Sequence, residues 1–577
     1  MARALDVEYL IGPDQLASEI SQRFEAWSSF RRTWTNEKKE IRDYVYATDT
    51  KTTTNSKNGW ANSTTTPKLT QIYDNLKANY EAALFPRDVN FRFQAGNAEA
   101  ASIVKATAVQ SYMEAKVRQS GFRTTVDRLV DDWVLTGNAF ATVDYSREFT
   151  ETEEGEIIQG YNGPTVVRIS PYDIAFDPTV AEFKNTPKIV RTLKTMGELH
   201  IKALTDPATA EVLSKMMKNR SEVGHSGGQT EKSAGFIADG FSSIENYYQS
   251  SMVECLTFYG DIFDRSTNTT LVNRLITVMD RAYVVENKPN PSWLGTAAVF
   301  HVGWRSRPDN LYGMGPLDNL VGLQYRIDHL ENMKADVFDL IASPVLKVKG
   351  EVEDFVYAPG SKIILGEEGD VGFLVPDSTV LNADLQIQNI EFKMEELAGA
   401  PRQAMGFRTP GEKTAFEVEN LSQAANRIFN HKAARFEIEF LEPILNAMLE
   451  SARREMNTLE IVSQVDNGTG AVFFSEVSKE DITSKGTIVP YGARYFAESA
   501  RRIQTLQQLV GLKANMPDVG VHFSGLTIAK IIADEVKEPG LFGQNIQVDE
   551  TLETQKIAND AAVDLEEDQQ IKAEAGL

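Results

Sequence analysis

The feature that most constrains this chain is the alternation of long helical and short extended patterns between Gly313 and Pro443. Apolar residues recur at spacings of three and four from Leu317 to Ala342, which predicts one long helix. These residues are Leu320, Leu323, Ile327, Leu330, Val337 and Leu340. At about 1.5 Å per residue this helix would be roughly 39 Å long. Pro344 is expected to end it.

The segment after this helix predicts small hairpins and then a second helix. Residues 345–378 alternate short apolar runs with glycines, a pattern typical of β-hairpins. Residues 382–398 carry a narrow apolar stripe of the width expected for helix-on-helix packing. Its members are Ala383, Ile387, Ile390, Met394 and Leu397. The stripe fits either a helical hairpin core within one chain or an interface between subunits.

A third helix is expected over about 414–455. Thr414 and Glu417 have the spacing of a capping box, in which each side chain bonds a backbone N–H at the start of the helix. Pro443 lies inside the periodic pattern, where it removes one backbone donor and clashes with the preceding turn. The sequence therefore predicts a kink near Leu441.

The remaining chain mixes helical and strand patterns, so we expect an α+β fold of several domains. Helices are predicted over 14–46, 68–84, 98–119 and 122–136, and strands from about 137 to 304. Polar stretches at 48–67 and 220–243 cannot bury enough apolar area and are interpreted as mobile loops. After residue 456 we expect a short β patch, helices and an acidic, solvated tail.

Composition excludes several classes of protein. The 577 residues carry a formal net charge of −23, which disfavours tight wrapping of nucleic acid. Cys255 is the only cysteine, so no intrachain disulfide can form, and six scattered histidines offer little for a zinc site. We expect no cofactor. The charged amino terminus and the lack of a long apolar run predict an intracellular, soluble protein without a membrane segment.

Residues 399–414 form the most unusual local sequence. Gly406 to Thr414 imitates a phosphate-binding loop, but Glu412 separates the second glycine from Lys413, and the segment follows a helix instead of a strand. The same loop carries Arg402 and Arg408 without an acidic residue up to Gly411. It fits an ordinary interhelical turn with solvated arginines. It also fits a weak phosphate contact that becomes useful when many copies surround DNA.

Candidate catalytic groups do not converge in the sequence. Adjacent acids at 353–354, 367–368 and 395–396 are more typical of solvated faces, and no nucleophile motif or metal-ligand spacing accompanies them. We therefore do not expect an enzyme. A cytoplasmic enzyme of unknown type stays open as an alternative, and it would need a pocket with convergent, perturbed groups.

Several stretches together resemble the portal (head-to-tail connector) proteins of tailed bacteriophages, most of all those of short-tailed phages. Gly313-Met-Gly-Pro-Leu317 leads into the long helix, and Glu395-Glu-Leu-Ala-Gly-Ala-Pro-Arg402 ends the second. The third helix contains Phe440-Leu-Glu-Pro-Ile-Leu445, and Tyr491-Gly-Ala-Arg494 is followed by Ala500-Arg-Arg-Ile-Gln-Thr-Leu506. The similarity covers roughly residues 120–515 in its order of elements. Its motifs are moderately specific.

The resemblance implies a domain layout for the whole chain. It assigns 1–316 to an N-terminal region and mixed α/β wing, 317–343 to a stem helix, 344–378 to a clip, 379–399 to a second stem helix, 400–413 to a channel loop, 414–457 to a long kinked wing helix and 458–577 to a helical crown with the acidic tail. The implied channel-loop residues are Arg402, Gln403, Arg408 and Lys413. The implied docking residues on the clip are Lys347, Lys349, Glu351, Glu353 and Asp354.

The resemblance also implies a role and partners. Portals are similar in forming rings of twelve subunits at one capsid vertex of the virion, after assembly in the host cytoplasm. They conduct double-stranded DNA during packaging and ejection, while a separate terminase motor hydrolyses ATP. The implied partners are further copies of the chain, the motor, tail adaptors, the major capsid protein and the scaffold. Another head–tail or tail adaptor protein of a phage is the alternative.

Overall fold

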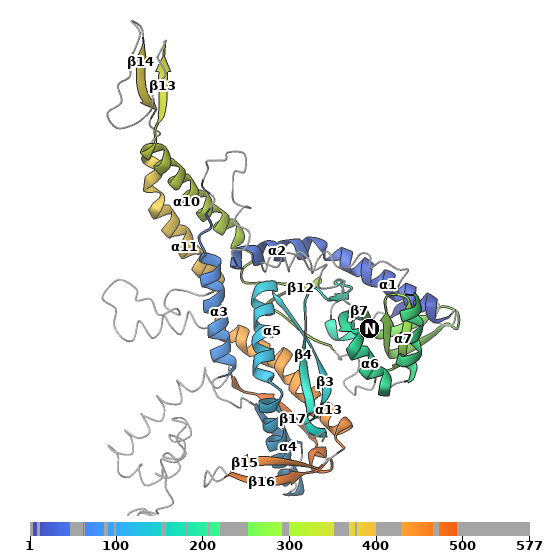
Figure 1. Cartoon of the computed structure of the whole chain (residues 1–577). Coiled ribbons are helices and arrows are strands. Elements are labelled where there is room, and N and C mark those ends of the chain that lie inside the picture. Colours follow the sequence, from blue (N-terminus) through green and yellow to red (C-terminus); the bar gives the residue numbers. More distant parts are fainter. Residues whose placement is uncertain are drawn as a thin grey trace, which may run out of the picture. The chain divides into compact units, whose positions relative to one another are not determined.

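The structure is a computed structural model that describes residues 4–7, 12–46, 62, 64–85, 91–96, 100–151, 157–180, 182–205, 207–219, 252–290, 299–350, 369–374, 378–399, 428–457, 459–465 and 472–492 (Figure 1). The chain separates into two compact units, one of Met1–Ala82 with Ser120–Arg454 and one of Ala83–Gln119 with Glu455–Leu577. Each unit contains helices and strands. The predicted mixed α+β class is therefore confirmed at that level.

The larger sheet of the first unit is antiparallel over most of its width. Its neighbouring strands are, in order, β5 (Ile174–Phe176), β6 (Lys188–Thr195), β7 (Met252–Asp264), β8 (Thr269–Met279) and β9 (Tyr283–Pro289). The short strand β1 (Leu5–Val7) adds to the end of β7 in parallel, opposite Ile262 to Asp264. β-branched and aromatic residues are frequent in these strands, as their preference for extended structure favours.

Helices cover the larger sheet through two buried clusters. Helix α1 (Pro13–Phe30) buries Leu16, Ile20, Phe24 and Trp27 against a cluster that includes Leu256 and Phe258 of β7. Helices α6 (Met196–Thr205) and α7 (Pro207–Asn219) pack on Val253 and Cys255 of the same strand. Because side chains alternate along a strand, these two clusters lie on opposite faces of the sheet.

The predicted helix over 14–46 is in fact two helices. Helix α2 (Arg32–Tyr46) begins after Arg31, whose backbone leaves helical geometry. The buried Arg31 guanidinium donates hydrogen bonds of 2.6 Å to the carbonyls of Pro171, Tyr172 and Ile174. This contact with residues distant in sequence explains the break between α1 and α2. No local sequence pattern predicts it.

The second sheet of this unit has the order β10 (Val299–Gly303), β3 (Asn138–Glu151) and β4 (Ile157–Ile169), all antiparallel. Helix α5 (Phe122–Thr136) precedes it and places Trp133 in an aromatic cluster. Trp133 lies 4.5 Å from Trp304, 4.8 Å from Phe436 and 5.1 Å from Tyr80, measured between ring centroids. Tyr80 belongs to α3 (Lys68–Leu84), so the cluster joins segments that are far apart in sequence.

A helix, a hairpin and a second helix follow the small strand pair β11 (Arg305–Arg307) and β12 (Asn310–Met314). They are α10 (Val321–Ala342), the antiparallel strands β13 (Val345–Lys349) and β14 (Asp370–Leu374), the 3₁₀ turn η4 (Ser378–Ala383) and α11 (Asp384–Ala398). Figure 1 shows α10 and α11 side by side, with the hairpin at their shared end. Both predicted helices are confirmed, with later starts than expected.

The third predicted helix is described from residue 428 onward and contains an irregular turn. Residues Glu437–Leu441 form a π-helical turn, η5, directly before α13 (Glu442–Glu455). Pro443 has no N–H to offer the carbonyl of residue 439, and its ring crowds that carbonyl. The wider turn accommodates both effects, and it lies at the position where the sequence predicted a kink.

The described part of the second unit contains one long helix and two strand pairs, each of which forms a small sheet. Helix α4 (Ala100–Gln119) accompanies β2 (Phe91–Ala95), which pairs with β17 (Gly486–Pro490). Strands β15 (Glu460–Val465) and β16 (Val472–Val477) form a hairpin, and the 3₁₀ turn η6 (Asp481–Thr483) follows. The short β patch expected after residue 456 is confirmed by β16. Among residues 459–492 the structure describes strands and a 3₁₀ turn and no long helix of the predicted crown. Residues 493–577 lie outside the described part.

Candidate functional site: the α10–α11 helix pair and its hairpin

The predicted channel loop lies outside the described residues. Arg402, Gln403, Arg408 and Lys413 are all in this stretch. The structure describes where it begins: Gly399 ends α11 in the left-handed region, at φ 73°, and its N–H bonds the carbonyls of Glu395 and Glu396. Glycine adopts this conformation without a Cβ clash, so the helix ends here for a local reason.

The predicted docking residues are only partly described. Lys347 and Lys349 lie exposed on β13, whereas Glu351, Glu353 and Asp354 lie outside the described residues. The described strands of the hairpin also expose apolar side chains on the same element. Val345, Val348, Phe373 and Leu374 are 54, 46, 56 and 57% exposed. A two-stranded hairpin is marginally stable alone, and these side chains would gain from a partner surface.

Helices α10 and α11 pack through a narrow buried seam. Ile327 and Leu330 of α10, with Ile387, Met394 and Ala398 of α11, are buried. Of the predicted stripe, Ile387 and Met394 are thus confirmed as buried. Leu397 of the same stripe is 59% exposed in the single chain.

The same two helices leave large apolar side chains in water. The exposed set on α10 is Tyr325, Met333, Phe338 and Ile341, and on α11 it is Leu385, Phe392 and Leu397. Phe338 is 64% exposed and Leu385 is 73% exposed. Scattered single apolar residues are ordinary on a protein surface, but here they are concentrated on one helix pair and its hairpin. We call these seven side chains the apolar surface of the pair.

Ion pairs join the two helices to each other and to the rest of the unit. Lys334 of α10 pairs with Asp384 of α11. Lys68, at the start of α3, lies 2.6 Å from Glu395 of α11, and both residues are buried. Lys38 of α2 pairs with Asp318 just before α10, and burial lowers the pKa of Lys38 while Asp318 opposes that shift. The last two pairs connect the base of the helix pair to α3 and α2 within the unit.

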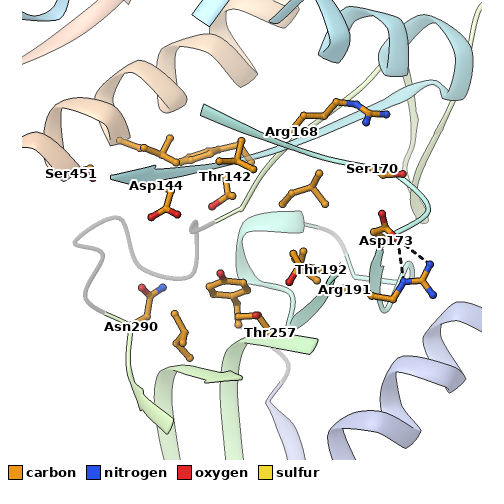
Figure 2. A pocket seen from close by; sticks show the side chains of 18 of the residues that line it. Thr142, Asp144, Arg168, Ser170, Asp173, Arg191, Thr192, Thr257, Asn290 and Ser451 are labelled. Atoms are coloured by element: carbon orange, nitrogen blue, oxygen red, sulfur yellow. Dashed lines mark hydrogen bonds and ion pairs between the residues drawn. The ribbon is translucent and has the colours of Figure 1, made fainter. Parts of the chain in front are cut away.

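A separate cavity of about 570 Å³ lies between the two sheets and α13 (Figure 2). Its lining charges are already engaged within the protein. Arg168 makes two bonds of 2.5 and 2.6 Å to Asp132, and Arg191 bonds Asp173 at 2.9 and 3.1 Å. Burial raises the pKa of Asp132 to about 6, and Arg168 opposes this rise. The size would admit a small molecule. The first of these pairs joins β4 to α5, and the second joins β6 to the residue before β5, so both arginines are used in holding neighbouring elements together.

Other perturbed groups serve packing. Lys188 is fully buried, its Nζ donates to the carbonyl of Phe183 at 3.0 Å, and burial lowers its pKa to about 7. His301 stacks on Phe140, and burial with nearby Lys188 lowers its pKa to about 3. The neutral ring lies 3.0 Å from Asn138 Oδ1 and donates to it. Burial raises the pKa of Cys255 to about 11, so its thiol is unreactive at neutral pH.

Within the described residues, no group of three or more His, Cys, Asp or Glu side chains is placed to hold a metal ion. None of the helices in that same part of the chain combines the length and apolar character needed to cross a bilayer. Comparison of the chain with models of known protein families and with curated proteins gives no match.

Proposed function

We propose that the chain is the portal subunit of a tailed bacteriophage and assembles into a closed ring through which double-stranded DNA passes. The proposed layout makes α10 and α11 the stem, the β13–β14 hairpin part of the clip, and residues 400–413 the channel loop. The order helix, hairpin, helix, basic loop and long kinked helix supports this assignment, together with the sequence resemblance. The proposed ring has no need for ATP chemistry of its own.

The apolar surface of the α10–α11 pair is the observation that carries the proposal. Seven large apolar side chains on two adjacent helices would each lose contact with water if another copy of the pair packed beside them. A fully buried side chain of this size contributes about 1.5–3 kcal/mol, so several per subunit would support a stable assembly. Repetition of such a contact around an axis closes into a ring.

The experiment compares two variants that place a charge on equally exposed apolar residues. Phe338→Lys alters the helix pair, and Ile201→Lys alters α6, where Ile201 is 68% exposed. We expect the wild type and Ile201→Lys to form one large particle by mass photometry at micromolar concentration. Phe338→Lys should raise the subunit concentration needed for assembly at least tenfold, because a charge would be buried in every interface.

Circular dichroism of both variants checks that each is folded. Equal assembly of the two variants would remove the helix pair from the interface. A particle of only a few subunits would instead favour a different head–tail adaptor.

A further inference from the structure

A row of polar side chains runs along one face of α10. Gln324, Asp328, Asn332 and Asp336 follow at intervals of four residues, so they share that face. The first three are buried, with 1, 0 and 7% of their surface exposed. We call these four residues the rail. Buried polar groups require hydrogen-bond partners, and the partners of the rail are unusual.

The rail binds the backbone of an extended segment that precedes α3. Asn332 Oδ1 accepts the Thr64 N–H at 2.8 Å, and its Nδ2 donates to the Thr64 carbonyl at 3.0 Å. One step along, Asp328 Oδ1 accepts the Thr66 N–H at 2.9 Å, and Gln324 Nε2 donates to the Thr66 carbonyl at 2.6 Å. At the outer end Asp336 Oδ1 accepts the Asn62 N–H at 2.6 Å.

The spacing of the two elements explains this ladder. Four residues of a helix rise about 6 Å, and two residues of an extended chain span about 6.6 Å. Every second residue of the segment therefore meets the next side chain of the rail. The segment, residues 62 and 64–68, is called the strap below. Residues 62 and 64–67 of the strap belong to the stretch 48–67, which the sequence predicted to be a mobile loop, and in the structure their backbone is bound to the rail.

The far end of the strap reaches the second helix of the pair. Lys68 Nζ lies 2.6 Å from Glu395 Oε1 of α11, and Gln324 Oε1 accepts the Leu69 N–H at 3.2 Å. Leu69 then continues into α3, where it is completely buried. The strap therefore connects α10 and α11 to α3 within one subunit.

Hydrogen bonds, rather than apolar burial, hold the strap on the rail. The Thr64 and Pro67 side chains are exposed. The Thr65 hydroxyl and Asp328 Oδ2 are buried without a hydrogen-bond partner among the described residues. A segment with few apolar contacts and unsatisfied polar atoms opens locally far more easily than a packed core.

We infer that the strap is a releasable clasp that fixes the α10–α11 pair to α3 and frees the pair when it opens. In the closed state, the rail holds the backbone of the strap, and Lys68 secures α11. In the open state, the helix pair keeps its own seam and its Lys334–Asp384 contact but loses this link to α3. The inference concerns a single subunit and does not depend on the proposed ring.

Hydrogen–deuterium exchange of the full chain, followed by mass spectrometry of peptides, tests the clasp. In the wild type, the amides of Thr64 and Thr66 should be protected. Asn332→Leu keeps the size of the side chain but removes both of its bonds, and we expect at least tenfold faster exchange in peptides covering the strap. Exchange in α11 should also increase, whereas peptides of α5 should be unchanged.

Two controls separate the clasp from ordinary destabilisation. Arg326→Gln changes an exposed side chain on the same helix and should leave strap exchange unchanged, as should Thr64→Val, because the rail contacts only the backbone there. If Asn332→Leu speeds exchange throughout the unit, Asp336→Ala at the half-buried outer end provides the milder test. Unprotected strap amides in the wild type, or strap exchange unaffected by Asp336→Ala and Asn332→Leu, would overturn the inference.

Discussion

Several buried charged side chains in this protein bind backbone groups. Arg31 donates to three carbonyls of one loop, Asp328 accepts a backbone N–H of the strap, and Lys188 donates to a carbonyl. Such contacts fix a chain segment in place without specifying its side chains. Burial also raises the pKa of Asp328 and lowers the pKa of Lys188.

Lys188 gives a pH prediction at this scale. Burial lowers the pKa of Lys188 from 10.5 to about 7 in the folded protein. At pH values between 7 and 10.5 the unfolded chain therefore binds more protons than the folded chain. Stability from this residue therefore rises with pH above 7. We expect the wild type to gain about 2 kcal/mol relative to Lys188→Met between pH 7 and pH 9.

Urea unfolding followed by tryptophan fluorescence measures this difference, because all six tryptophans belong to the first unit. The free energy of unfolding of the wild type and of Lys188→Met is compared at each pH. Parallel curves for the two proteins would show that Lys188 keeps an ordinary pKa when folded.

At the scale of elements, the sequence predicts the helices and strands that depend on interactions between residues close together in the chain. The helices α10 and α11, the hairpin between them and the disturbance before Pro443 are all visible in apolar spacing, glycines and one proline. The break at Arg31 is not, because a loop 140 residues away causes it. The rail was also missed: polar residues at intervals of four look like a solvated face until the strap is known to cover them.

The apolar surface is a second feature that could not be predicted from the sequence. The stripe of α11 fits both an internal seam and a subunit interface, and the structure divides it, since Ile387 and Met394 are buried and Leu397 is exposed. Periodicity alone cannot distinguish side chains that pack inside one chain from those that would pack on another copy. Burial in one subunit makes this distinction.

The predicted channel loop, residues 400–413, gives a prediction for one element. Replacing Arg402, Arg408 and Lys413 together with glutamine should leave particle assembly intact, because none of these residues belongs to α10 or α11. We expect at least a tenfold loss of packaged DNA, since each subunit would lose three cations that meet phosphate. An infection assay measures the DNA content of the capsids.

The matched control removes three cations elsewhere, with Lys184, Lys215 and Arg326 changed to glutamine. This control should package normally. Full packaging by the loop variant would show that residues 400–413 have no part in DNA passage.

At the scale of the whole molecule, composition and surface agree with one role. A net charge of −23 would keep a conduit from binding duplex DNA tightly. A short basic loop within such an acidic chain would make only weak contacts with phosphate. Arg168 and Arg191, which line the cavity between the sheets, are each paired with an aspartate. A subunit of this kind would act by shape and assembly.

Single-particle electron microscopy of the assembled full-length protein tests the central claim most directly. The account predicts a closed ring of subunits around an open channel wider than a DNA duplex, which is about 20 Å across, with the α10–α11 pairs of neighbouring subunits packed through their apolar surface. Single chains at micromolar concentration, or a ring that carries the α10–α11 pairs on its outer rim, would contradict it.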